Sequence, residues 1–318
     1  MSQAEFDLAR RLRRTYWGRK VFLRAIVEFS NHCRQNCLYC GLRRDNPDIR
    51  RYRLTPERIY DCAVIAKRLG IGTLVLQSGE DPWYSGTDMA DLIFRIKSDL
   101  DLAVTLSLGE RTREEYAQWR KAGADRYLLK VETWDPAAYA RLRPGKTLKE
   151  RLESFTTLAA LGYETGSGII AGLPGDTDDS LRQACLRLAE LTPDMVSISP
   201  FVPHPASPLR DHPGLDVETT LGLMAFARIA MPSAHIPVTS ALGLKGDAVR
   251  LRALEVADVL MPSLTPAEVR ENYAIYAGKN QQKDAPEARA RTMRDMLLTA
   301  GFTLPEGAGE AWRKHNSP

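Results

Sequence analysis

The sequence of 318 residues has no long hydrophobic run and no strong excess of charge of either sign. No stretch approaches the roughly 20 apolar residues that a transmembrane helix needs, so we expect no membrane partner. Its 44 basic and 40 acidic residues leave a formal net charge of only +4. Nucleic-acid binding usually requires a strongly basic face, so we expect no nucleic-acid partner either. The N-terminus lacks the apolar core of a signal peptide.

Cysteine is also scarce, because the chain has only 5, an odd number. Three of them fall within eight residues, which is too close for the disulfide framework of a secreted protein. We therefore expect a cytoplasmic protein whose thiols stay reduced.

Short apolar runs recur at steady intervals along the chain. Each is near-continuous and rich in β-branched residues, which is typical of parallel strands buried on both faces. The runs span 21–29, 73–79, 103–109, 125–133, 165–172, 195–201, 236–241 and 258–263. Helical patterns separate them, at 55–70, 112–123, 176–191 and 248–257. Eight such strands predict an α/β fold, a closed (β/α)8 barrel of the TIM type. A doubly wound open sheet is the alternative, although it usually has fewer strands per domain.

The chain shows no linker and no low-complexity tract, which favours one barrel domain over residues 21–279. A basic helical arm, 1–20, precedes it, with Phe6, Leu8 and Leu12 on one face. We expect this arm to close the bottom of the barrel. The polar extension, 280–318, is expected to wrap the outside or fray.

The strongest chemical signal is the Cys-x3-Cys-x2-Cys spacing of Cys33, Cys37 and Cys40. Three thiolates this close can hold one 4Fe-4S cluster and leave its fourth iron without a protein ligand. The cysteines follow the first predicted strand, at the end where barrel active sites lie. A structural zinc site would need a fourth ligand, and the only neighbour, His32, directly precedes Cys33.

This spacing, with Tyr39 just before the last cysteine, resembles the radical S-adenosylmethionine (radical SAM) superfamily. The resemblance implies that S-adenosyl-L-methionine binds the open iron and is cleaved to a 5′-deoxyadenosyl radical. It also implies a reductant such as ferredoxin or flavodoxin as a partner. Further segments resemble the HydE family of FeFe-hydrogenase maturases, whose relatives include biotin synthase and methylornithine synthase. In chain order they are IVEFSNHCRQNCLYCGLRRDN, VLQSGEDPWY, VTLSLGE, GADRYLLKVET, RLRP, GLPGDT, FVPHPASPL and NYAIYAGK.

The resemblance implies a set of residues that contact the cofactor, most of them at predicted strand ends. They are Tyr39, Ser78, Gly79, Glu80, Ser107, Glu132, Arg151 and Gly168. The residue types fit this role, because glycine allows close approach and arginine pairs with carboxylates. An ordinary strand-to-helix turn would also suit Gly79.

The resemblance implies a second set of residues around the substrate. They are Thr105, Arg126, Met195, Thr239, Ser240, Met261, Tyr273 and Tyr276. A buried Arg126 with hydroxyls around it would suit an anionic ligand. Core packing explains the two methionines equally well. His204, between two prolines, is expected to be a loop residue.

The function implied is maturation of the hydrogenase active-site cofactor, the H-cluster. The substrate would be a small molecule or an iron complex, here a cysteine-bound iron carbonyl and cyanide precursor. Other hydrogenase maturases would be partners.

Three alternatives remain open from the sequence. One is a radical amino-acid mutase of the methylornithine synthase type. A second is sulfur insertion like that of biotin synthase, for which only Cys62 and Cys185 remain as ligands of another cluster. The third is a non-catalytic iron–sulfur protein for electron transfer or sensing. One departure from the family is Lys130, where we expect arginine.

Overall fold

A computed structural model of the protein describes residues 2–281 and 284–313, and six of its parallel strands form one continuous sheet. The remaining parts of the predicted arm and extension, residues 1, 282–283 and 314–318, lie outside the described residues. In spatial order the six strands are β2 (Ala25–Ser30), β3 (Thr73–Ser78), β4 (Ala103–Ser107), β5 (Arg126–Leu128), β6 (Glu164–Ala171) and β7 (Met195–Pro200). Each corresponds to a predicted run.

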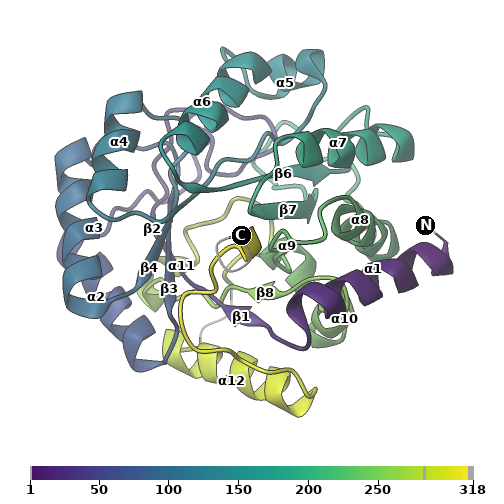
Figure 1. The fold of residues 1–318 in the computed structure, drawn as a ribbon. Helices are drawn as coiled ribbons and strands as arrows, with labels where there is room; N and C mark the ends of the chain where they lie inside the picture. The colour runs from purple at the N-terminus through teal and green to yellow at the C-terminus, as the bar shows by residue number, and fades with distance from the viewer. Residues whose placement is uncertain (1, 282–283, 314–318) are drawn as a thin grey trace.

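Short pairings close this sheet into a barrel, which confirms the predicted fold class (Figure 1). β1 (Phe22–Leu23) pairs in parallel with β8 (Val259–Leu260). Single bridges join Met195 to His235, Pro237 to Val259, and Ile26 to Ser263. The ring of parallel strands is therefore complete, although between β7 and β2 it is joined only by single bridges and the short β1–β8 pairing.

The predicted strand at 236–241 is the exception, because the described residues show no regular strand there. Pro237 has no N–H to donate to a ladder, which restricts this segment to a bridge. Thr239 already accepts a hydrogen bond from the N–H of Leu242, as the N-cap of the next helix.

Helices surround the barrel and alternate with the strands, as the sequence predicts (Figure 1). Several begin with a Ser or Thr whose side chain caps the first turn, which fixes where each strand-to-helix loop ends. No helix in the described part of the chain is long and apolar enough to cross a membrane. The outer helices are α2 (Pro56–Arg68), α3 (Gly86–Leu100), α4 (Arg113–Lys121), α5 (Pro136–Leu142), α6 (Leu148–Ala160), α7 (Asp178–Glu190), α8 (Val217–Ala230), α9 (Ser240–Gly243), α10 (Asp247–Ala253), α11 (Ala267–Arg270) and α12 (Pro286–Thr299).

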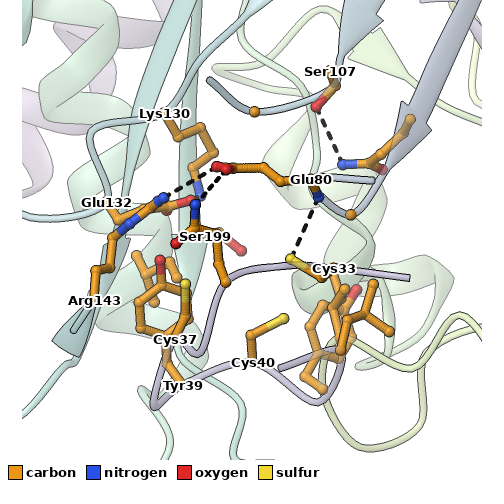
Figure 2. A pocket seen from close by; sticks show the side chains of 18 of the residues that line it. Cys33, Cys37, Tyr39, Cys40, Glu80, Ser107, Lys130, Glu132, Arg143 and Ser199 are labelled. Atoms are coloured by element: carbon orange, nitrogen blue, oxygen red, sulfur yellow. Dashed lines mark hydrogen bonds and ion pairs between the residues drawn. The ribbon is translucent and has the colours of Figure 1, made fainter. Parts of the chain in front are cut away.

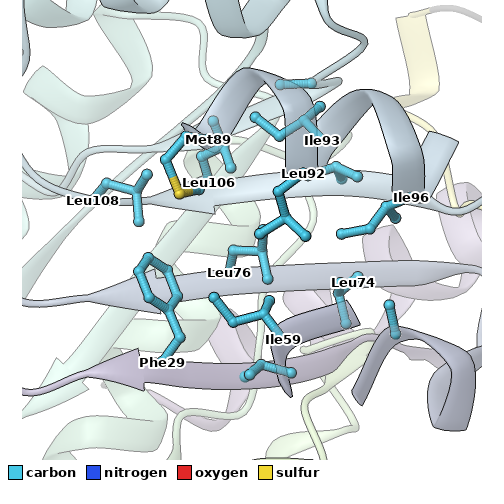
Figure 3. Packing of buried hydrophobic residues seen from close by; sticks show 14 of the residues in the cluster. Phe29, Ile59, Leu74, Leu76, Met89, Leu92, Ile93, Ile96, Leu106 and Leu108 are labelled. Atoms are coloured by element: carbon cyan, nitrogen blue, oxygen red, sulfur yellow. The ribbon is translucent and has the colours of Figure 1, made fainter. Parts of the chain in front are cut away.

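Alternation along each strand separates the packed core from the barrel interior. Leu74 and Leu76 of β3 face outward and pack with Ile93 and other apolar residues of the surrounding helices (Figure 3). The alternate residues of this strand, Val75 and Gln77, face the other side. Burial of this outer layer contributes on the order of 25 cal/mol per Å² of apolar surface.

The N-terminal helix α1 (Gln3–Trp17) packs along α8 on the outside of the barrel. Its buried residues are Ala9, Arg13 and Trp17, spaced one turn apart. The predicted apolar face is therefore wrong for Leu8, which is 38% exposed. Only the last turn of the helix reaches the bottom of the barrel, where Trp17 stacks on His235.

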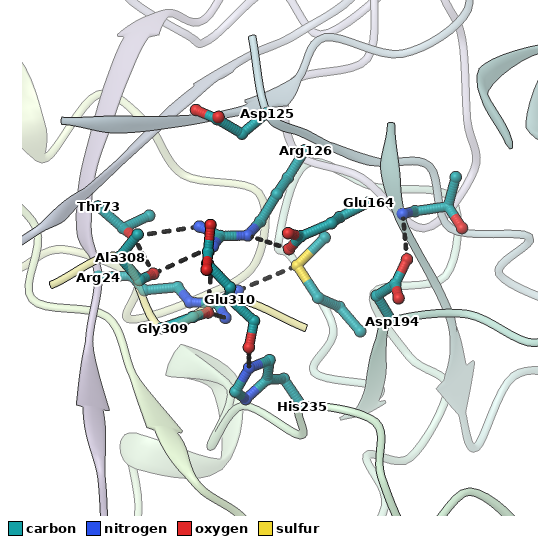
Figure 4. Close-up of polar contacts among 12 residues, drawn as sticks. Arg24, Thr73, Asp125, Arg126, Glu164, Asp194, His235, Ala308, Gly309 and Glu310 are labelled. Atoms are coloured by element: carbon teal, nitrogen blue, oxygen red, sulfur yellow. Dashed lines mark hydrogen bonds and ion pairs between the residues drawn. The ribbon is translucent and has the colours of Figure 1, made fainter. Parts of the chain in front are cut away.

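The C-terminal extension corrects a second expectation, because it closes the bottom of the barrel as well as covering its outside. The hydroxyl of Thr73 donates to the carbonyl of Ala308 at 2.7 Å. Arg126 donates to the carbonyls of Ala308 and Gly309, and Arg24 donates to Gly309 (Figure 4). Three side chains at or next to the N-terminal ends of the strands thus bind the backbone of the extension.

Candidate active site at the carboxyl ends of the strands

The three cysteines predicted to bind a cluster line one pocket at the carboxyl ends of the strands (Figure 2). Their loop follows β2 and has no regular secondary structure, so side chains must hold it in place. The guanidinium of Arg51 does so by donating to the carbonyls of Asn31, Leu42 and Arg43, at 2.5, 2.9 and 2.7 Å.

The loop after β3 touches the cysteine loop directly. The backbone N–H of Glu80 donates to the sulfur of Cys33 over 3.4 Å. A Cβ on Gly79 would lie 2.2 Å from the carbonyl oxygen of His32 and 2.8 Å from the Cβ of Cys33. Glycine is therefore required at this position by close approach of the two loops, whereas the sequence suggested close approach of the cofactor.

The thiols need a positive charge beside them to ionise. Burial raises the pKa of the Cys33 thiol to about 11 and raises the pKa values of Cys37 and Cys40 as well. Iron ions would supply that charge, and soft thiolate donors suit iron–sulfur clusters. The donor set and its depth in the pocket therefore fit a cluster.

A single-metal site fits less well. Within residues 2–281 and 284–313, no three His, Cys, Asp or Glu side chains converge closely enough to hold one metal ion. Thiolates that bind separate irons of a cluster need not converge on one point.

A network of buried charges forms the wall opposite the cysteines, and Glu80 is at its centre (Figure 2). Its carboxylate accepts a hydrogen bond from Gln35 at 2.6 Å and lies 3.4 Å from the guanidinium of Arg143 and 3.9 Å from that of Arg151. Arg34 approaches it from the surface at 3.5 Å. Buried charges persist only when paired in this way.

Glu110, just beyond β4, completes the pairing of Arg151. Its carboxylate lies 3.1 Å from Arg151 and accepts a hydrogen bond from Lys146 at 2.7 Å. Burial acts to raise the pKa of Glu110, but these two cations outweigh it, so the pKa lies below its usual range. The hydroxyl of Tyr139 also contacts Arg151, at 3.0 Å. The guanidinium is thereby fixed at the wall of the pocket.

Glu132 has an unusual backbone, with φ at +67°. This left-handed conformation is unfavourable for a residue with a side chain and is often retained at functional sites. Two hydrogen bonds to β6 hold it there, from the N–H of Glu132 to Gly168 and from that of Ile170 to Glu132. The strained backbone directs the Glu132 carboxylate to Lys130 at 2.9 Å, on the pocket wall.

The structure brings most of the predicted cofactor contacts together. Besides the cysteines, the lining contains Tyr39, Ser78, Gly79, Glu80, Ser107, Glu132 and Arg151. Gly168 lies outside this lining, and a Cβ there would be 2.1 Å from the carbonyl oxygen of Ser197 on β7. Sequence reasoning gave no role to Gln35, Arg143 and Ser199, which also line the pocket, as does Lys130, noted only as a departure from the family. The RLRP segment carries the one available signal, for Arg143.

Some of the predicted substrate residues reach the same pocket. Tyr273 and Tyr276 line it. Ser240 forms hydrogen bonds with the hydroxyl of Tyr276 and with Lys279. Lys279 in turn lies 2.9 Å from the carboxylate of Glu28, inside the barrel. Neither Lys279 nor Glu28 was predicted from the sequence as part of this region.

The other predicted substrate residues do not line this pocket. Arg126 lies at the opposite end of the barrel, 2.6 Å from Glu164 (Figure 4). Met195 lies at the start of β7, where its sulfur accepts a hydrogen bond from Arg24. Thr105 is buried in the middle of β4, and Thr239 caps α9. Met261 follows β8 and is partly buried.

Residues 27–224 match the family model described as "Radical SAM superfamily". The chain is 48% identical over 281 residues to the [FeFe] hydrogenase maturase subunit HydE of Thermotoga maritima, which covers 87% of this chain and 80% of that protein. It is 30% identical to 3-methylornithine synthase of Methanosarcina acetivorans, over 84% of this chain and 77% of that protein.

Solved structures agree on the fold. The crystal structure of methylornithine synthase superimposes with a TM-score of 0.85 at 27% identity, over 96% of this chain and 91% of that one. A crystal structure of HydG, a maturase of the [FeFe]-hydrogenase, gives a TM-score of 0.80 at 20% identity, over 95% of this chain and 69% of that one. The latter likeness concerns the fold alone. With three thiols in one pocket at the mouth of a parallel barrel, and with relatives of this similarity, the chain belongs to the radical SAM superfamily.

Proposed function

We propose that this radical SAM enzyme acts in maturation of the FeFe-hydrogenase H-cluster, on a cysteine-bound iron carbonyl and cyanide precursor. The observation that carries the proposal is the 48% identity to HydE over 87% of the chain. The pocket supports it, because the segments that carry the resemblance supply most of the lining.

The cofactors in this proposal are one 4Fe-4S cluster on the three cysteines and S-adenosyl-L-methionine. When bound, they supply a 5′-deoxyadenosyl radical through one-electron cleavage of the sulfonium. The chain's own residues hold and orient the cofactor. Arg151, fixed between Glu110 and Tyr139, can pair with a carboxylate, and the Glu80 and Glu132 carboxylates can accept hydrogen bonds from an ammonium group or hydroxyls. The buried wall keeps water from the reacting atoms.

The substrate would lie in the same pocket, against Tyr273 and Tyr276. The cationic groups of Lys130 and Arg143 suit an anionic complex, and the tyrosine hydroxyls can donate to it. Thr105, Arg126, Met195, Thr239, Ser240 and Met261 stay predictions as substrate contacts.

Sulfur insertion by a second cluster fits the structure poorly. Cys62 and Cys185 are buried in two different hydrophobic clusters, on α2 and α7. Ligands of one cluster must share one site. The two remaining cysteines are therefore core residues.

The cofactor part of the proposal is tested by anaerobic reconstitution with iron and sulfide. We expect about one four-iron cluster per chain, whose paramagnetic spectrum changes when S-adenosylmethionine is added. Cys37→Ala should abolish reductive cleavage of the cofactor, while the matched variant Cys185→Ala should retain it. Unimpaired cleavage by Cys37→Ala would refute the ligand assignment.

The substrate part is tested in a cell-free maturation mixture that lacks only HydE. We expect the reconstituted protein to restore hydrogenase activity. A parallel assay offers amino acids and follows their rearrangement by mass spectrometry. Rearrangement of an amino acid with no restored hydrogenase activity would favour the mutase alternative and end the maturase proposal.

A further inference from the structure

A chain of hydrogen bonds runs from a buried ion pair to the pocket tyrosine Tyr276. The ammonium of Lys279 lies 2.9 Å from the carboxylate of Glu28 and donates to the hydroxyl of Ser240 over 3.3 Å. Ser240 is hydrogen-bonded in turn to the hydroxyl of Tyr276. Of these four residues, Tyr276 alone is among the described residues that line the pocket. The ion pair and the serine therefore reach the pocket through the tyrosine.

The backbone holds Lys279 in this place. Its neighbours Gly278 and Asn280 have left-handed φ angles, of +81° and +61°. Glycine and asparagine adopt this conformation at the least cost. The side chain of Asn280 also donates to Glu28, at 3.2 Å. The ammonium of Lys279 is consequently buried and fixed beside the carboxylate that compensates its charge.

The donors available set the direction of the chain. An ammonium group has N–H donors and no acceptor, so the oxygen of Ser240 accepts from Lys279. A hydroxyl that accepts from a cation is polarised and becomes a stronger donor itself. This favours donation from Ser240 to Tyr276. The phenol of Tyr276 then retains its own O–H for another acceptor.

The phenol of Tyr276 is also kept protonated. Burial raises its pKa above the ordinary value, although Lys279 and Ser240 act to lower it. A protonated phenol can donate a hydrogen bond, and a phenolate cannot. Because Tyr276 is buried and lines the pocket, an acceptor atom of a molecule bound there can take this hydrogen bond. The ammonium at the other end of the chain strengthens the donor toward an acceptor that carries negative charge.

We propose that Ser240 and Lys279 are positioning residues, which hold Tyr276 as a hydrogen-bond donor to a negatively charged acceptor atom of the substrate. The inference rests on the proposed function for the identity of that substrate. It gives Ser240 a different role from the direct substrate contact that the family resemblance implies. It also gives a role to Lys279, for which the sequence indicated none.

A double-mutant cycle on the reconstituted enzyme separates the two roles of Ser240. The probe is a synthetic cysteine-bound iron complex with carbonyl and cyanide ligands, and the readout is the rate of cofactor cleavage as the complex is titrated. In Ser240→Ala and in Tyr276→Phe, the half-saturating concentration should rise about tenfold and the maximal rate should fall less, as expected for one lost hydrogen bond to a charged group. The double variant should bind the complex no more weakly than Tyr276→Phe alone, since Ser240 acts through the phenol.

A direct contact between Ser240 and the substrate would give another result. The two losses would then multiply to about a hundredfold in the double variant, and that outcome would overturn the positioning role. Ser240→Thr keeps the hydroxyl and should restore the wild-type titration. The matched control is Ser98→Ala/Tyr60→Phe, whose two hydroxyls contact Asp99 on the exposed side of α2 and α3. It should leave the titration unchanged.

A second measurement needs no substrate. The infrared C–O stretching band of Tyr276, identified with ring-labelled tyrosine and by its loss in Tyr276→Phe, reports the hydrogen bonds of the phenol. We expect this band to shift in Ser240→Ala and in Lys279→Gln and to keep its position in Ser98→Ala. If Lys279→Gln does not fold, Glu28→Gln/Lys279→Gln replaces it, because that variant buries no unpaired charge. An unshifted band in Ser240→Ala would overturn the hydrogen-bond chain.

The failure of this inference and that of the proposed function are distinguishable. A wild-type enzyme whose cofactor cleavage does not respond to the iron complex would contradict the proposed function. The infrared band would still decide whether Ser240 and Lys279 position the phenol of Tyr276.

Discussion

Gly79 shows how one residue couples the two loops at the pocket. Gly79→Ala should place a methyl group against the backbone of His32 and the side chain of Cys33, with no room for either to move. Overpacking of this kind costs about 1–3 kcal/mol. We expect a lower free energy of unfolding in urea and less iron retained after reconstitution.

The control for this change is Gly145→Ala, where a Cβ would meet no atom within 4 Å. Its φ of +76° means that only backbone strain is added. Iron retention should then stay near wild type. Similar iron loss in both variants would show that the close approach at Gly79 has no special importance.

At the scale of single residues, the sequence predicted which strand-end side chains share one pocket, but not which other residues complete its walls. The carboxyl ends of parallel strands lie at one edge of the sheet. Ser78, Ser107 and Glu132 therefore line the same pocket as the cysteine loop. Arg126 starts its strand and therefore lies at the other edge. Arg143 joins the pocket because the segment between α5 and α6 folds back to Glu80, and no periodic pattern indicates this; only the RLRP segment points to it.

Among the elements, the segment that carries Tyr273 and Tyr276 is tied to β2 by a buried ion pair. Lys279 lies 2.9 Å from Glu28, which also accepts hydrogen bonds from Ser263 and Thr265. Burial acts to raise the pKa of Glu28, but Lys279 and these hydroxyls lower it to about 2. This carboxylate should therefore anchor the tyrosine segment over the pocket.

Acid should release that anchor. The folded pKa of about 2 lies below the ordinary value of 4.5, so the stabilisation is present above pH 4.5 and is lost as the pH falls toward 2. At pH 7, Glu28→Gln should lower the free energy of unfolding by about 3 kcal/mol, because it leaves Lys279 buried without its carboxylate. The difference from wild type, measured by urea unfolding at pH 7, 4 and 3, should shrink as the pH falls.

Glu218→Gln is the comparison, since Glu218 pairs with Arg252 on the exposed surface. Water and salt screen such pairs, so we expect little effect at any of these pH values. If the Glu28 variant kept the same deficit at pH 3 as at pH 7, the carboxylate would not be the group that anchors the segment.

The element order along the chain was predictable because buried parallel strands and capped helices leave local patterns. The conformation of residues 236–241 was not predictable in this way. Their apolar residues resemble those of a strand, but Pro237 limits the pairing to a single bridge. The path of the C-terminal extension was also not predictable from the sequence. Ala308 and Gly309 are held by side chains from β3 and β5, and such long-range contacts have no periodic signature.

For the whole barrel, closure is uneven, and this has a measurable consequence. Six strands form a continuous ladder, whereas single bridges and a two-residue strand pair join β7, the His235 segment, β8 and β1. Regions with few backbone hydrogen bonds open at lower free energy than the rest. Backbone amides of β3 and β4 should therefore exchange hydrogen most slowly, and those of Val238 and Val259 faster.

The pH should act on this seam more than on the ladder. His235 is buried between Trp17 and the carboxylate of Asp258, and burial lowers its pKa below the ordinary 6.5. A histidine with a lowered folded pKa stabilises the fold above the unfolded value, and that contribution is lost as the pH falls below it. Between pH 7.5 and 5.5, after correction for intrinsic rates, protection should fall at Val238 and Val259 and stay constant in β3. Uniform loss of protection across the barrel would mean that the seam and the ladder open together, and that His235 does not hold the closure.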